Sequence, residues 1–411
     1  MPSRPTPRPR TAALALTGAL AVALTGCSGG SPSAATSPSA TTPSATPTTA
    51  SPTPTPTPTC VETTLESLDE DQRLGQLLMV GFDTNADLSS LDEEIGQDHV
   101  GNVIYLGGWE GADKVERTSK HLQGLVSEKA TGDVGLMVAA DQEGGEVHQL
   151  RGEGFTRPPT ARDQAQMSSA QLTKAATGWA KELRAVGVNV NLAPVTDTVP
   201  ESLGRGNEPI GKYGRQYGSD PKTVEKASAA FIEGMLDGGV EATVKHFPGI
   251  GRIRNNTDFN ASGITDATTS ADDPYLEPFA AGVEAGAGLV MTSSAKYTKL
   301  DPGVPAMFSE KIVTGLLREK LGFDGVVITD DVNAESVRAT PPGERAVKVL
   351  AAGGDIVLTG DASTAPAMLK ALKAQATADD DFAATLDASV ERVLTLKDRM
   401  GLLPCSGTPQ D

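Results

Sequence analysis

Ionisable and hydroxyl side chains occur repeatedly where a short apolar run of this sequence ends. They are Asp141, Asp197, Lys245, His246, Thr292 and Asp330. Carboxylates placed in pairs can supply a nucleophile and a proton donor, and lysine and imidazole can donate hydrogen bonds to hydroxyl groups at fixed angles. Helix capping would account for one or two of these residues. So many converging polar groups instead predict a polar pocket of about the size of a sugar.

Eight runs rich in Val, Ile and Leu must position these residues, and amphipathic stretches of helical period separate the runs. The runs are 74–82, 100–106, 134–141, 188–197, 241–246, 288–293, 325–330 and 354–359. Apolar runs that alternate with helices predict parallel strands buried on both faces, and eight of them predict a single closed (β/α)8 barrel. A doubly wound open sheet is the alternative. In a barrel the chemistry collects at the carboxyl ends of the strands, where the polar residues stand.

The most specific motif runs from Leu316 to Asn333 and joins a helix, a turn containing glycine, a buried strand and two adjacent carboxylates. It resembles the active-site signature of glycoside hydrolase family 3, and the resemblance extends over nearly all of residues 62–404. In that family the aspartate after Ser or Thr is the nucleophile, which implies this role for Asp330. Two aspartates that only cap the next helix are the alternative reading.

Four further blocks resemble the family in the same order along the chain. The Asp-Gln-Glu-Gly-Gly block implies that Asp141 holds a sugar hydroxyl, and the Ala-Pro-Val-x-Asp block ends the next strand at Asp197. A following loop matches the segment whose arginine contacts the sugar, which is Arg215 here. The Lys-His-Phe-Pro-Gly block implies that Lys245 and His246 bind substrate.

The proton donor is where the sequence departs from the family pattern. Family members place an Asp-x-His dyad on the loop after the lysine-histidine strand, and here Asp258 matches the aspartate whereas Asn260 replaces the histidine. Asparagine cannot transfer a proton at neutral pH, whereas imidazole titrates near it. We therefore expect Asp258 to act as the general acid and base, either directly or through a water. Gln149 likewise replaces an arginine of the family, and Arg151 lies close by.

Single-barrel members of the family are mostly β-N-acetylglucosaminidases that act on cell-wall fragments. The resemblance therefore implies a retaining exo-glycosidase that removes terminal β-N-acetylglucosamine from cell-wall glycans or muropeptides through a covalent glycosyl-aspartate intermediate. A β-glucosidase or a phosphorylase is the first alternative. A sugar-binding lipoprotein with weak or no turnover is the second, because of Asn260. We expect no cofactor and no metal, since no His, Cys and Asp cluster has ligand spacing, and a monomer as the default.

The amino-terminal segment has the layout of a bacterial lipoprotein signal. Basic residues precede an apolar run over 12–24, and small residues precede Cys27, which predicts a signal over 1–26 and lipid on Cys27. A plain secretory signal is the alternative, and the run is shorter than the roughly 20 residues of a membrane helix. Residues 27–59 are rich in Ser, Thr and Pro, which predicts a disordered linker.

The composition of the chain agrees with export and a sugar substrate. The net charge of -18 argues against nucleic acid as a partner. We expect an extracytoplasmic barrel over 60–405, held to the membrane only by lipid, with a tail over 406–411. Cys60 and Cys405 flank that barrel, and in an oxidising compartment they are expected to form a disulfide, with two free thiols as the alternative.

Overall fold

The computed structural model describes residues 58–406 of the 411-residue chain. The signal expected over 1–26 and the expected lipidation site Cys27 lie outside the described residues. So do nearly all of the linker and of the carboxyl-terminal tail.

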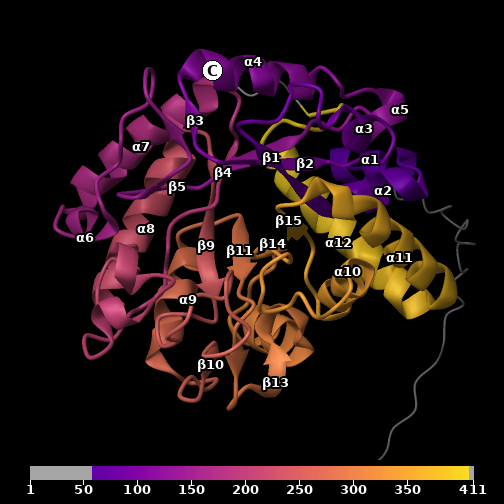
Figure 1. Cartoon of the computed structure of the whole chain (residues 1–411). Coiled ribbons are helices and arrows are strands. Elements are labelled where there is room, and N and C mark those ends of the chain that lie inside the picture. Colours follow the sequence, from indigo (N-terminus) through magenta and orange to yellow (C-terminus); the bar gives the residue numbers. More distant parts are fainter. Residues whose placement is uncertain (1–57, 407–411) are drawn as a thin grey trace, which may run out of the picture. The chain divides into compact units, whose positions relative to one another are not determined.

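Eight parallel strands form one sheet, and each lies within or overlaps one of the eight apolar runs (Figure 1). They are β1 (Leu78–Asp83), β2 (Asn102–Leu106), β4 (Met137–Ala140), β8 (Val190–Asn191), β9 (Glu241–Phe247), β11 (Leu289–Thr292), β14 (Val326–Thr329) and β15 (Val357–Thr359). Consecutive strands are neighbours, β15 pairs with β1, and a parallel bridge between Ile328 and Ile356 joins β14 to β15. The strands therefore close into a (β/α)8 barrel, and the open doubly wound sheet is excluded.

Helices cover the outside of the barrel and connect its strands (Figure 1). The longer ones are α4 (Ala112–Gln123), α7 (Ser169–Ala185), α8 (Pro221–Asp237), α9 (Glu277–Glu284), the helix Lys311–Lys320, α10 (Pro342–Ala351), α11 (Ala365–Ala378) and α12 (Asp380–Arg399). The shorter ones are α1 (Cys60–Ser67), α2 (Glu70–Gly75), α3 (Asp92–Gly96), α5 (Glu128–Thr131) and α6 (Ala161–Gln164). Single helical turns occur at Gly204–Gly206, Gly211–Tyr213, Pro274–Leu276, Ala306–Phe308 and Ala362–Thr364. No helix within 58–406 is long and apolar enough to span a bilayer.

Helix α8 illustrates how the sequence builds this outer layer. The Asp220 side chain accepts a hydrogen bond from the Thr223 N–H, which caps the helix, and Pro221 occupies its first turn. Its buried face includes Phe231. Gly234 allows α7 to come close, because a Cβ at that position would lie 2.4 Å from the Thr173 carbonyl oxygen.

Small sheets extend the loops that follow the barrel strands. Strands β10 (Thr265–Asp266), β12 (Lys296–Tyr297) and β13 (Asp301–Pro305) form one of them, β3 (Trp109–Glu110) pairs with β7 (Leu150–Arg151), and β5 (Gln142–Gly144) pairs with β6 (Val147–His148). These segments leave the barrel at the carboxyl ends of β2, β4, β9 and β11. They therefore build the walls of the end at which a barrel of this type carries its chemistry.

The opposite end of the barrel is closed by the carboxyl-terminal segment. The fully buried Lys397 of α12 donates hydrogen bonds to Gln76 Oε1 at 2.6 Å and to the carbonyl oxygens of Gly101 and Gly135, both at 2.9 Å. These three acceptors precede β1, β2 and β4, so one ammonium group ties together the amino ends of three strands.

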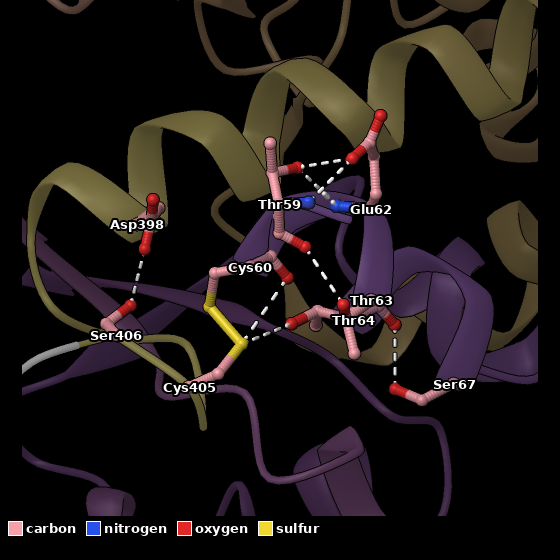
Figure 2. Close-up of a disulfide and its surroundings, with 9 residues drawn as sticks. All are labelled: Thr59, Cys60, Glu62, Thr63, Thr64, Ser67, Asp398, Cys405 and Ser406. Atoms are coloured by element: carbon pink, nitrogen blue, oxygen red, sulfur yellow. Dashed lines mark hydrogen bonds between the residues drawn. A yellow bond between two sulfur atoms is a disulfide. The ribbon is translucent and has the colours of Figure 1, made fainter. Parts of the chain in front are cut away.

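Figure 2 shows the disulfide between the start of α1 and the segment that follows α12. Cys60 and Cys405 are bonded, with their Cα atoms 5.7 Å apart, and the Gly135 N–H donates to the Leu402 carbonyl oxygen at 2.7 Å close by. The expected disulfide is therefore confirmed, and the two-thiol alternative is wrong for this structure.

Candidate active site

A cavity of about 440 Å³ opens at the carboxyl ends of the barrel strands. The residues singled out from the sequence that line it are Asp141, Arg215, Lys245, His246, Asp258 and Asp330. Asp197 does not line the cavity and lies behind His246, fully buried. The structure thus brings six of the seven catalytic or substrate-binding candidates to one cavity, whereas Asp197, expected to bind substrate, instead holds His246.

A buried ion cluster forms one wall of the cavity. The Lys245 ammonium lies 2.5 Å from Asp141 Oδ1 and 2.7 Å from Glu143 Oε1. Arg215 donates to the same glutamate twice, from Nε at 2.8 Å and from Nη2 at 2.7 Å. Glu143 therefore connects the two cations and fixes the direction in which each of them points.

The charges of this cluster are held firmly in their ionised forms. Burial acts to raise the pKa of Glu143, but the neighbouring Arg215 and Lys245 outweigh it and lower that pKa to about 2. Burial acts to lower the pKa of Lys245, but Asp141 and Glu143 raise it above its ordinary value. Lys245 consequently stays a hydrogen-bond donor at any pH at which the protein works.

His246 is oriented from behind by Asp197. Its Nδ1 lies 2.7 Å from Asp197 Oδ2, and the other oxygen of Asp197 accepts from the Ile250 N–H at 2.6 Å. A carboxylate bonded to Nδ1 fixes the ring plane and directs Nε2 away from it. Since His246 lines the cavity, its free ring edge can contact a bound ligand, and Asp197 is a positioning residue.

Asp330 follows the end of β14 and is held on the rigid frame of the barrel. Its N–H donates to the Thr292 carbonyl oxygen of β11 at 2.9 Å, and its Oδ1 accepts from the Asp331 N–H at 2.9 Å. The Asp331 carboxylate holds neighbouring backbone, since its Oδ1 accepts hydrogen bonds from the N–H groups of Asn333 and Gly360. Of the adjacent carboxylates, Asp330 is therefore the one placed to react.

Asp258 stands on the loop between β9 and β10, which is tied down on two sides. Asn256 stands at the start of the turn, and its N–H donates a hydrogen bond to Glu208 Oε2 at 3.2 Å. The Asp258 carbonyl oxygen accepts from the Glu335 N–H at 3.1 Å, in the loop that follows Asp330. The loop that carries Asp258 is therefore hydrogen-bonded directly to the loop that follows Asp330.

The Asp258 carboxyl has the character of a proton donor. Solvent reaches it through the cavity, yet protein atoms surround it on most sides. This partial desolvation, followed by the negative charge of Asp330, raises its pKa from 3.8 to about 6, while His246 and Arg215 act in the opposite direction. A carboxyl that remains protonated near pH 6 can act as a general acid.

The two departures from the family pattern have structural uses of their own. Asn260 Nδ2 donates to the Asn256 carbonyl oxygen at 3.0 Å, so this amide closes the turn that carries Asp258. Gln149 Oε1 accepts from the Gly108 N–H at 3.0 Å and does not line the cavity. Neither residue can take over proton transfer.

A model of the glycosyl hydrolase family 3 N-terminal domain matches residues 69–396. The chain belongs to glycosyl hydrolase family 3. The matched segment contains every barrel strand of this family 3 chain and every residue of the cavity described above.

Solved family 3 structures resemble the chain closely. A β-N-acetylhexosaminidase from Beutenbergia cavernae is 48% identical with a TM-score of 0.78, over 80% of this chain and 98% of that one. A β-N-acetylglucosaminidase from a Paenibacillus species is 32% identical with a TM-score of 0.72, over 84% of this chain and 65% of that one. A curated β-hexosaminidase from Stenotrophomonas maltophilia is 36% identical over 230 residues, and the match spans 66% of its length.

Among the site residues that were not predicted from the sequence, Glu143 and Phe259 stand out. Glu143 is central to the ion cluster, and its presence between Asp141 and a Gly-Gly pair was the available signal, since a carboxylate there shares the strand end with Asp141. Phe259 also lines the cavity. Within residues 58–406, no three His, Cys, Asp or Glu side chains are arranged to hold a metal ion.

Proposed function

We propose that this chain is a retaining exo-β-N-acetylglucosaminidase that releases terminal N-acetylglucosamine from cell-wall glycans or muropeptides. The proposal is supported by family membership and by the similarity of the chain to hexosaminidases and a glucosaminidase. The observation that carries it is the pairing, in one cavity, of Asp330 with a second carboxyl whose pKa is raised to about 6. Retaining glycosidases require these two groups.

In the first step, a carboxylate oxygen of Asp330 forms a bond to the anomeric carbon, and the bond from that carbon to the leaving oxygen breaks. Asp258 gives its proton to the leaving oxygen. In the second step, Asp258 takes a proton from water, whose oxygen displaces Asp330 and releases the sugar.

The electrostatic coupling between the two aspartates suits this exchange of roles. The negative charge of Asp330 raises the pKa of Asp258 in the free enzyme. Once Asp330 is an ester, that charge is gone and the pKa of Asp258 falls. The same residue is therefore protonated when an acid is required and ionised when a base is required.

The polar wall of the cavity binds and orients the sugar. Lys245 and Arg215 present positive charge, and Asp141 and the free edge of His246 complete the set of donors and acceptors. Because Glu143 and Asp197 fix these side chains in advance, little reorganisation is needed when the sugar binds.

Hydrolysis of a chromogenic β-N-acetylglucosaminide, measured with and without inorganic phosphate, tests this proposal. Release of N-acetylglucosamine with retained configuration and no effect of phosphate is the expected result. A sugar phosphate as product would identify a phosphorylase, faster cleavage of a glucoside a β-glucosidase, and sugar binding without turnover a binding protein.

We also propose that the enzyme is exported and anchored through lipid on Cys27. The basic start, apolar run and small residues before Cys27 support this. Metabolic labelling with a radioactive fatty acid tests it, since label should appear in the wild-type chain and be absent from Cys27→Ser. Unlabelled wild-type protein in the culture medium would instead indicate a plain secretory signal.

A further inference from the structure

Phe259 is an exposed aromatic residue beside the catalytic residues. Three large hydrophobic side chains of the described residues are classed as exposed, and Phe259 is the most exposed of them at 75%, against 46% for Leu88 and 41% for Tyr213. A single exposed apolar residue is ordinary on a protein surface. Phe259 differs because it lines the catalytic cavity together with Asp258 and Asp330.

Hydrogen bonds on both sides of Phe259 fix its position. The Phe259 N–H donates to the Asn256 carbonyl oxygen at 3.3 Å, and Asn260 Nδ2 donates to the same oxygen at 3.0 Å. Asn256 Oδ1 in turn accepts from the Asp258 N–H at 3.0 Å. Phe259 therefore sits in a closed turn at the cavity that it lines.

A second set of contacts holds this turn over the cavity. The carbonyl oxygens of Thr257 and Asp258 accept from the N–H groups of Ser336 and Glu335, both at 3.1 Å. The loop that bears Phe259 is thus bonded to the loop that follows Asp330. The exposed side chain of Phe259 is therefore carried by a backbone segment that hydrogen bonds hold in place.

The position of the ring relative to Asp258 indicates which part of the substrate it meets. A general acid must lie within hydrogen-bond reach of the leaving oxygen, at the boundary between the departing group and the sugar that is retained. Phe259 is the next residue, and the ion cluster around Lys245 occupies the inner wall where the retained sugar binds. The ring therefore borders the space of the leaving group.

We propose that Phe259 is a stacking platform for the leaving-group sugar, an inference that rests on the proposed function. One face of a pyranose ring presents mainly C–H groups, and such a face packs on an aromatic ring that offers no competing polar atom. A platform at this place favours substrates whose leaving group is a second sugar ring. It does not bear on the sugar that is transferred to Asp330.

Steady-state kinetics with two substrates that differ only in the leaving group test the platform. Chitobiose carries a sugar ring as leaving group, whereas methyl β-N-acetylglucosaminide carries only a methyl group, which is too small to stack. Phe259→Ala should lower kcat/KM for chitobiose about tenfold, as expected for one lost aromatic contact, and change the methyl glycoside less than about twofold. Phe259→Trp should keep the preference for chitobiose.

Tyr213→Ala is the matched control, because Tyr213 is an exposed aromatic residue of a neighbouring loop that does not line the cavity. It should change neither substrate. Equal losses on both substrates after Phe259→Ala would show that the residue only supports the turn of Asp258, and no loss on either would end the proposal.

Binding provides a readout that does not depend on turnover. In an Asp330→Asn background, calorimetry should show chitobiose binding more tightly than N-acetylglucosamine, and Phe259→Ala should remove most of that difference. If this result holds while the wild-type chain cleaves neither substrate, the platform stands and the proposed function fails. If wild type cleaves both but Phe259→Ala leaves the affinity difference intact, only the platform is refuted.

Discussion

Glu143 and Arg215 form a two-point salt bridge in the wall of the catalytic cavity, with Nε–Oε2 at 2.8 Å and Nη2–Oε1 at 2.7 Å. The same glutamate also holds Lys245 at 2.7 Å. Two cations that face the substrate thus depend on one carboxylate that is itself almost entirely buried.

The first prediction is that Glu143→Gln impairs both stability and substrate binding. Removing one partner of a buried ion pair leaves uncompensated charge, so the free energy of unfolding should fall by about 3–5 kcal/mol. KM should rise, because Arg215 and Lys245 lose the group that orients them. Urea denaturation and steady-state kinetics would measure the two effects.

Glu277→Gln is a suitable control for this variant, because Glu277 forms an exposed ion pair with Lys222. It should cost less than about 1 kcal/mol. The pKa of Glu143 is lowered from 4.5 to about 2, so its contribution to stability is complete above pH 4.5 and is lost as the pH falls toward 2. Equal effects of the two variants would contradict a special role for Glu143.

The second prediction concerns the nucleophile. Asp330→Asn should reduce turnover by about 10⁴-fold or more while the fold is retained, because the covalent intermediate can no longer form. A mechanism-based fluorinated glycoside should label wild type at Asp330, as peptide mass spectrometry would show. A label on Asp331 or Asp197 would show that Asp330 is not the nucleophile.

The third prediction is that Asp258 controls the alkaline side of the pH profile. A general acid must be protonated, and the pKa of Asp258 is raised to about 6, so kcat/KM should fall as the pH rises above 6. Asp258→Ala should remove this limb. It should slow chitobiose cleavage by about 10²–10⁴-fold and slow nitrophenyl glycosides much less, because a good leaving group needs little protonation.

Azide offers a further check on Asp258→Ala. As a small nucleophile that needs no general base, it should partly restore the turnover of nitrophenyl glycosides and form a glycosyl azide. Equal losses on both substrate classes without rescue by azide would assign Asp258 to binding or to loop structure.

The fourth prediction uses the buried Lys397 at the other end of the barrel. Burial lowers the pKa of Lys397 from 10.5 to about 7. Between pH 7 and pH 10.5 the unfolded chain therefore binds more protons at this residue than the folded chain, and the stability contributed at this site should rise with pH. The difference in unfolding free energy between wild type and Lys397→Met should grow in favour of wild type over that range.

Urea denaturation at several pH values between 7 and 10 would measure this trend. Lys174→Met changes an exposed lysine of α7 and should give a difference that does not vary with pH. A constant difference for Lys397→Met as well would mean that Lys397 remains charged in the fold.

The barrel and most of its site could be predicted from the sequence because both depend on local patterns. Buried strands read as apolar runs, and the barrel geometry brings the strand-end residues Asp141, Lys245 and Asp330 to one mouth. Glu143 could not be assigned in this way. Its role exists only because Arg215, from a loop after another strand, folds back onto it.

The roles of residues in the loop after β9 could not be predicted from the sequence either. From its residues alone, Asn260 appeared only as a missing histidine. In the structure it donates a hydrogen bond that closes the turn, and this turn brings Phe259 to the cavity that it lines. Such roles depend on the path of the backbone, which no periodic pattern encodes.

The Cys60–Cys405 bond makes the folded segment a covalent ring of chain. A single proteolytic cut in any loop between these residues would not divide it, because the disulfide would still join the two fragments. The exposed turn at Phe259 could be cleaved in this way and the two pieces would still migrate together without reductant. Proteolytic damage at that turn would then inactivate the mouth of the barrel without releasing half of the enzyme.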